Sequence, residues 1–306
     1  MIKQKFKKYL SFALKRVFRE EIEKDMVLKA KNLAFKNNKI KKIKNLSEVE
    51  FQVFSQWGED GIIDWIINKC NNIPKSFLEI GTENYKESNT RFLLISKNWD
   101  GFLIEADKEA VSEIKSQRIY WRHNLKIKNQ FVNKENINKI IKQLKIPKKI
   151  GFLSLDIDGI DYWILKELKI ISPVILVCEY NSLFGSKKSV TVPYKKKFQR
   201  NKEHYSNLYF GSSIKALINL LKNKNYVFLG TNSSGNNAFF VKKNFSKKII
   251  NSIKEKKIFL SKYRESRNRK GSLSYLSKDK SLNLIKNKFL IDLSKNKLVK
   301  ISSLKL

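Results

Sequence analysis

The sequence contains few of the residues that mark secreted or membrane-spanning proteins. Among 306 residues there are only two cysteines, Cys70 and Cys178, and both lie in apolar contexts, which indicates reduced, buried thiols rather than a disulfide. No apolar run approaches the roughly 20 residues that are needed to cross a bilayer. The basic N-terminus lacks the long apolar stretch and small-residue cleavage site of a signal peptide. These absences predict a cytoplasmic protein.

Acidic residues are also scarce: 28 Asp and Glu oppose 64 Lys and Arg, so the formal net charge is +36. A charge of this size is typical of proteins that bind nucleic acid or anionic membranes. Only nine of the basic residues are Arg, however, and surfaces that recognise nucleic acid depend on the forked Arg side chain. Because the Lys residues are spread along the whole chain, the charge favours a general solvated surface, and nucleic acid is not an expected partner.

The content of 42% hydrophobic and 12% aromatic residues is enough for a sizeable core. Patterning divides the chain into three expected parts: a basic helical extension over 1–50, a main domain over 51–245 and a basic extension with a small terminal hairpin over 246–306. The helix is predicted because residues 3 to 38 contain no Pro or Gly and have apolar residues at helical spacing. It could lie on an anionic membrane surface, or it could pack on the domain or on a second copy of the chain. Glu20, Glu21, Glu23 and Asp25 favour packing, because an anionic surface would repel them.

Short apolar runs alternate with helical patterns through the main domain. Strands are predicted at 76–80, 100–105, 119–127, 151–155 and 174–178, which is typical of a parallel sheet covered by helices on both faces. Two further strands, 226–230 and 238–241, are separated by a short turn-rich loop and predict an antiparallel hairpin. The expected fold is therefore an α/β, Rossmann-like sheet that is mostly parallel and closes with an antiparallel hairpin.

Polar side chains follow two of these strands. Asp156, Asp158 and Asp161 come after the strand at 151–155, while Glu179 and Asn181 come after the next one. Open α/β sheets bind ligands at the carboxyl ends of their strands, so we expect these groups at one rim. Asp158, Asp161, Glu179 and Asn181 supply the hard oxygen ligands that suit Mg²⁺ or Ca²⁺.

Acids also surround the first strands. The turn that contains Gln56, Glu59 and Asp60 holds two glycines, which suits a turn folded over a ligand. The first strand ends in Glu79-Ile80-Gly81. The second ends at Glu105, at the distance expected of an acid that accepts hydrogen bonds from ribose hydroxyls.

The segments FSQWGEDGIIDWI, FLEIG, NWDGFLIEAD, LSLDIDGIDYWIL, CEYNS and GNNAFFV occur in this order between residues 51 and 243. The series resembles a bacterial family related to the FkbM-type S-adenosylmethionine (SAM)-dependent methyltransferases, in which an Asp-x-Glu-Gly-x-Glu pattern ends the fourth strand; here the pattern has Asp for Glu. The resemblance implies a class I methyltransferase fold, SAM as cofactor and O-methylation of a sugar, glycan or other small hydroxylated acceptor. The candidate cofactor-binding residues are Gln56, Glu59, Asp60, Glu79, Gly81, Glu105 and Asp107, and the candidate catalytic residues are Asp156, Asp158, Glu179 and Asn181.

Other readings of the sequence remain open. Asp156-Ile157-Asp158 also has the form of the Asp-x-Asp pair that holds a divalent ion on the sugar nucleotide of a glycosyltransferase. The basic composition is compatible with a non-catalytic module that binds anions or membranes. The long polar segment 182–209 is typical of a lid or substrate-binding segment. The Arg-rich stretch 263–267 could clamp a phosphate or carboxylate of the substrate, or it could be a solvated helix end.

Overall fold

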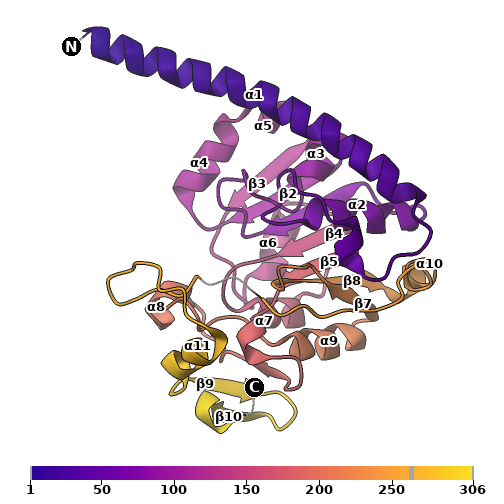
Figure 1. The fold of residues 1–306 in the computed structure, drawn as a ribbon, viewed down its shortest axis with the longest axis vertical. Helices are drawn as coiled ribbons and strands as arrows, with labels where there is room; N and C mark the ends of the chain where they lie inside the picture. The colour runs from indigo at the N-terminus through magenta and orange to yellow at the C-terminus, as the bar shows by residue number, and fades with distance from the viewer. Residues whose placement is uncertain (1, 262–264, 305–306) are drawn as a thin grey trace.

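The computed structural model describes residues 2–261 and 265–304, with side chains from residue 21 onward. Its centre is a seven-stranded sheet in the order β3-β2-β1-β4-β5-β8-β7 (Figure 1). The strands are β1 (Ser76–Ile80), β2 (Asp100–Glu105), β3 (Leu125–Asn129), β4 (Lys149–Leu155), β5 (Ser172–Glu179), β7 (Tyr226–Thr231) and β8 (Asn237–Lys242). The first five are parallel to one another, and β8 runs antiparallel to both β5 and β7. This confirms the prediction of a Rossmann-like sheet of the class I methyltransferase type with a closing antiparallel hairpin.

Helices cover both faces of the sheet, because successive strand residues point to opposite sides. Phe77 packs in a core with the inner side chains of α2, while its neighbour Leu78 packs with those of α6, α7 and α9. Both side chains are fully buried, which explains why the strands are apolar at nearly every position. The helices around the sheet are α2 (Glu59–Lys69), α3 (Arg91–Lys97), α4 (Lys108–Ser116), α5 (Arg118–Arg122), α6 (Ile137–Gln143), α7 (Asp161–Glu167), α9 (Ile214–Asn223) and α10 (Ser246–Ile250).

The third strand is shorter than the sequence predicts. Strand β3 begins only at Leu125, and the first part of the predicted strand is the helix α5. Ile119 and Tyr120 give this part its apolar character, yet both are only partly buried, and the Ile119 carbonyl accepts a hydrogen bond of 3.1 Å from the His123 amide. The local backbone bonds of the helix therefore outweigh the β-preference of one branched side chain.

The N-terminal helix α1 (Ile2–Lys39) extends along one end of the molecule, and its first turns project beyond the sheet domain (Figure 1). Ala30 and Ala34 form its buried contact with a small cluster that includes Phe51 and Phe92. A short 3-10 turn, η1 (Leu46–Val49), joins it to the domain. The side chains of the predicted amphipathic pattern before residue 21 lie outside the described residues. In the described chain, no helix combines the length and the apolar character that a membrane span requires.

The C-terminal residues form a second, antiparallel sheet at the other end of the molecule (Figure 1). The predicted terminal hairpin is present as β9 (Phe289–Asp292) and β10 (Lys297–Lys300), and β9 also pairs with β6 (Val190–Thr191). The helix α11 (Lys278–Ile285) packs against η2 (Ser182–Phe184), and α8 (Arg200–Glu203) lies in the same region. The polar segment 182–209 is thus held by the C-terminal extension. The remaining short turns are η3 (Lys243–Phe245) and η4 (Ile301–Ser303).

Candidate active site

A cavity of about 940 Å³ opens at the carboxyl ends of β1, β2, β4 and β5. Its wall includes Gly81 after β1, Glu105 at the end of β2, Asp156 after β4 and Glu179 at the end of β5. This is the edge at which open α/β sheets bind their ligands. The volume lies near the upper end of the usual range for small-molecule sites, so the cavity has room for a cofactor and an acceptor together.

Gly81 lies where the ends of β1 and β4 meet most closely. Its φ of +82° is unfavourable for other residues, and an added Cβ would lie 1.6 Å from the backbone oxygen of Asp156. Its amide donates a hydrogen bond of 3.0 Å to the Ile104 carbonyl of β2. The glycine is therefore required to bring three strand ends together at the floor of the cavity.

Glu105 is 9% exposed and lies on the cavity wall as expected, but most of its acceptor capacity is used within the protein. Oε2 accepts hydrogen bonds from the amides of Thr82 (2.9 Å) and Glu83 (2.8 Å), and Oε1 accepts one from Asp107 (2.8 Å). A carboxylate has about four acceptor positions, so one remains for a ligand hydroxyl instead of the two expected from the sequence. Glu105 thus shapes the loop after β1 as well as facing the cavity.

Glu79 also lies at the cavity and is almost fully buried. Its carboxylate accepts hydrogen bonds from the hydroxyls of Ser88 and Thr90 and from the amide of Asn89, which holds the loop before α3 against β1. Burial raises the pKa of Glu79 to about 7, despite these hydrogen bonds. The contacts that the structure shows for this side chain are structural.

Three of the predicted cofactor-binding residues, Glu59, Asp60 and Asp107, do not line the cavity, and each has a structural role instead. Asp60 Oδ2 accepts hydrogen bonds from the amides of residues 53 to 55 at 2.7 to 2.8 Å. Glu59 Oε1 accepts from the side-chain amides of Asn232 and Asn237 and so joins α2 to the hairpin. Asp107 accepts from two amides of the first turn of α4 and is its N-cap. Gln56, by contrast, lines the cavity.

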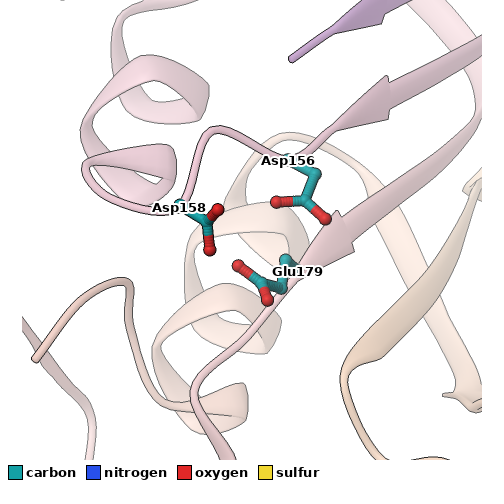
Figure 2. A group of neighbouring side chains, drawn as sticks. All are labelled: Asp156, Asp158 and Glu179. Carbon is teal, nitrogen blue, oxygen red and sulfur yellow. The ribbon is translucent and has the colours of Figure 1, made fainter. Parts of the chain in front are cut away.

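The main acidic group of the cavity consists of Asp156, Asp158 and Glu179 (Figure 2). One carboxylate oxygen from each residue lies within 4.8 Å of the others. Asp156 and Glu179 share a side-chain hydrogen bond. In the described part of the chain, no other N–H or O–H group donates a hydrogen bond to either residue, and Oε2 of Glu179 is buried without a partner. The sequence prediction that carboxylates from neighbouring strand ends meet at this rim is thus matched by the geometry.

The environment makes Asp156 and Glu179 poor anions. Desolvation raises the pKa of both carboxyl groups well above the usual range, and repulsion from Asp158 raises it further. Repulsion from Asp156 also raises the pKa of Glu179, whereas a hydrogen bond with Glu179 lowers the pKa of Asp156. Close carboxylates that lack other donors are stabilised when they share a proton or a cation. Acids with such shifted pKa values are concentrated at functional sites.

Asp161 and Asn181 were expected in this group, but both support it from outside. Asp161 accepts hydrogen bonds of 3.0 Å from the amides of Ile157 and Gly159, and so stabilises the turn in which Asp158 has a φ of +54°. Asn181 donates from its side-chain amide to the carbonyls of Leu208 and Phe210, and its oxygen accepts from Leu183. Each of these oxygens already accepts a hydrogen bond from a backbone amide, and Asp161 is not part of the close group formed by Asp156, Asp158 and Glu179.

Arg200 completes the group, and the sequence analysis missed it. Its guanidinium pairs with Asp158 and with Glu265 of the C-terminal extension, and it lies 3.7 Å from the centre of the Phe210 ring. The side chain is 12% exposed, and its positive charge lowers the pKa of Asp156 and Glu179, although less than desolvation raises it. Of the predicted Arg-rich stretch, Arg267 donates to the Gly271 carbonyl, while 263–264 lie outside the described residues.

Comparison with known proteins gives similarity in structure only. No protein-family model matches the chain, and neither does any curated protein. Among solved structures it is similar to the N-terminal domain of EvdMO1 with SAH bound, with 11% identity over 73% of this chain and 94% of that chain at a TM-score of 0.40. The chain is also similar to a SAM-dependent methyltransferase from Clostridium acetobutylicum, with 11% identity over 60% of this chain and 90% of that chain at a TM-score of 0.38. A third similar structure is the pyocyanin biosynthetic protein PhzM, with 7% identity over 56% of this chain at a TM-score of 0.35. The match covers 51% of PhzM, so the chain spans about half of that protein. At identities this low the activity cannot be transferred from these proteins and has to be inferred from the residues of the cavity.

Proposed function

We propose that this protein is a SAM-dependent methyltransferase that methylates a hydroxyl oxygen of a sugar, glycan or other small hydroxylated acceptor. One observation carries the proposal: a single cavity joins the glycine turn after β1 and the acid at the end of β2 to a group of protonatable carboxylates at the ends of β4 and β5. The first part suits a nucleoside cofactor, and the second suits the removal of a proton from an acceptor.

The cavity fits SAM in its size and in the chemistry of its wall. Gly81 lets the ends of β1 and β4 meet at the cavity, and Glu105 keeps one acceptor position for a ribose hydroxyl. Ile104 and Phe131, which also line the cavity, supply apolar surface for an adenine ring. When bound, SAM supplies a methyl group on a positively charged sulfur.

The carboxylates of Asp156 and Glu179 would remove the proton of the acceptor. Their raised pKa values make them stronger bases than ordinary carboxylates, which favours proton transfer near neutral pH. With SAM bound, one of these carboxylates would take the proton that the acceptor oxygen releases on methyl transfer. Arg200 holds Asp158 beside them and limits the negative charge of the group.

A divalent ion is the other means of balancing this charge. Asp156, Asp158 and Glu179 offer three oxygens of the kind that Mg²⁺ and Ca²⁺ prefer, and the unpartnered Oε2 of Glu179 favours an added ligand. Such an ion would lower the pKa of an acceptor hydroxyl. Elemental analysis of the purified protein tests this, together with titration of Mg²⁺ and Ca²⁺ into wild type and Asp158→Asn. The metal is ruled out if the purified protein contains none, if titration releases no heat and if chelation leaves the activity unchanged. The shared proton and Arg200 would then balance the negative charge of the three carboxylates.

The direct test of the function is a calorimetric titration with S-adenosylhomocysteine, followed by an assay for methyl transfer from labelled SAM to a panel of hydroxylated acceptors. We expect binding by the wild type and by the control Asp100→Asn, since Asp100 lies at the opposite end of β2. Binding of UDP-sugars with Mg²⁺ but not of S-adenosylhomocysteine would instead favour the glycosyltransferase. Binding of neither, with affinity for anionic vesicles, would favour a non-catalytic module.

A further inference from the structure

The N-terminus of α11 borders the cavity, although it belongs to the C-terminal extension. Ser277, Lys278 and Ser281 all lie on the cavity wall. Their spacing places Ser277 and Ser281 one turn apart on the same side of the helix, with Lys278 beside them. The extension therefore contributes two hydroxyls and an ammonium group to the same space as the acidic group.

The donors of the first turn have no acceptor among the residues that the structure describes. Ser277 is at the N-cap position, but its side chain makes no capping hydrogen bond. Within the described chain, the amides of residues 278 to 280 therefore remain available, and they point outward from the positive end of the helix. Lys278 has no ion pair among the described residues, so its charge is available as well.

Ser281 provides independent evidence for a ligand. The residue is only 4% exposed, it lines the cavity, and within the described chain its hydroxyl forms no hydrogen bond. Ser281 Oγ is not among the fully buried polar atoms without a partner, so this hydroxyl is open to the cavity. A ligand atom in the cavity can therefore reach it and form a hydrogen bond.

This position lies on the acceptor side of the cavity. Arg200, which pairs with Asp158, also pairs with Glu265, and the neighbouring Ser266 accepts a hydrogen bond of 3.1 Å at Oγ from the amide of Leu276, just before α11. The helix is thus linked to the β4 end of the cavity through the extension, whereas Gly81 and Glu105 belong to β1 and β2. A group bound here would be part of the acceptor and not of the cofactor.

We propose that the acceptor carries a phosphate group, and that this phosphate binds at the N-terminus of α11 to Ser277, Lys278 and Ser281. The identity of the ligand as an acceptor rests on the proposed methyltransferase function, while the anion site itself does not. A phosphate has enough oxygens to accept from the free amides and both hydroxyls at once, and helix N-termini favour such anions. Of the nearby acids, Glu265 is paired with Arg200, and Asp279 is exposed and lies outside the cavity wall.

The site can be tested without knowing the acceptor. Inorganic pyrophosphate is titrated calorimetrically into the full chain in metal-free buffer at about 0.15 M salt, which suppresses weak surface attraction. We expect Lys278→Gln to weaken binding about tenfold or more and Ser281→Ala about three- to tenfold, from the loss of a charged and a neutral hydrogen bond. The control is Lys280→Gln, which removes the same charge from the same helix turn at a residue outside the cavity wall and should change affinity less than about twofold.

The outcomes separate this proposal from the proposed function. Equal losses in Lys278→Gln and Lys280→Gln, or no binding at all, would overturn the anion site, because the attraction would then be that of a basic surface. Malonate binding as tightly as pyrophosphate would overturn the phosphate assignment in favour of a carboxylate. The same samples are also titrated with S-adenosylhomocysteine. If pyrophosphate binds and S-adenosylhomocysteine does not, the anion site is supported and the methyltransferase function is contradicted. Competition by glucose 1-phosphate, compared with vesicles of phosphatidylglycerol, distinguishes a soluble sugar phosphate from a lipid headgroup.

Discussion

The acids near β1 and β2 differ from those at the ends of β4 and β5 in what their carboxylates contact. Around β1 and β2, Asp60, Glu79 and Glu105 each accept several hydrogen bonds from backbone amides or hydroxyls. At the ends of β4 and β5, Asp156 and Glu179 hydrogen-bond to each other and accept none from the other described residues. The first arrangement stabilises loops, whereas the second costs stability, which is typical of functional sites. Acids that look alike in sequence therefore have opposite roles.

The largest effect should come from removing a charge on the β4 side. In Asp156→Asn the rate of methyl transfer should fall about 100- to 10,000-fold, because a positioned base contributes this much. Stability should stay equal or rise, because a repulsive carboxyl group is lost. Single-turnover kinetics with labelled SAM and urea unfolding measure the two. A variant that keeps its rate would show that Asp156 does not handle the proton.

Near β1, the substitution Asp60→Ala should lower the stability of the fold. It would leave three buried amides and a hydroxyl without their acceptor, at a cost of about 3 to 5 kcal/mol. Asp158→Ala is the matched control: its side chain is 53% exposed, so its ion pair should contribute less than about 1 kcal/mol. Urea unfolding measures both. Equal losses would contradict the contrast between the two groups of acids.

Glu105 tests whether an acid can serve both purposes. Glu105→Gln replaces one acceptor oxygen with a donor, so it should lower stability by about 1 to 3 kcal/mol through the loop at Thr82 and Glu83. Affinity for S-adenosylhomocysteine should fall about tenfold, since one acceptor position faces the ligand. Calorimetry and urea unfolding on the same sample check this, and Glu109→Gln on the exposed start of α4 is the control. Lower stability with unchanged affinity would show that Glu105 is structural alone.

A further effect concerns the dependence of stability on pH. The pKa of Glu79 is raised to about 7 in the folded protein, so the folded state holds this proton more tightly than the unfolded state does. Its contribution to stability is therefore fully present below the ordinary pKa of about 4.3 and is lost as the pH rises through 7, by at most about 1.4 kcal/mol per pH unit. Glu79→Gln should flatten this part of the curve in urea unfolding between pH 4 and 8. An unchanged slope would assign the dependence to other groups, such as Asp60 and Asp161, whose pKa values burial raises to about 6.

The sheet could be predicted from the sequence because its strands are apolar on both faces and its closing hairpin has a clear turn signal. The position of Asp156, Asp158 and Glu179 followed from their places at strand ends. What could not be predicted was which polar side chains are already hydrogen-bonded: Asp161 and Asn181 bind backbone groups that only the folded turns bring near. Arg200 was missed for the same reason, because Asp158 and Glu265 lie far from it in sequence.

The most direct test of the account is a calorimetric titration of S-adenosylhomocysteine into wild type, Glu105→Gln and Asp156→Asn. We predict that wild type and Asp156→Asn bind with affinities within about threefold of each other, and that Glu105→Gln binds about tenfold more weakly. This pattern would separate the cofactor side of the cavity from its reactive side. Absence of binding to the wild type, or a loss in Asp156→Asn as large as that in Glu105→Gln, would contradict it.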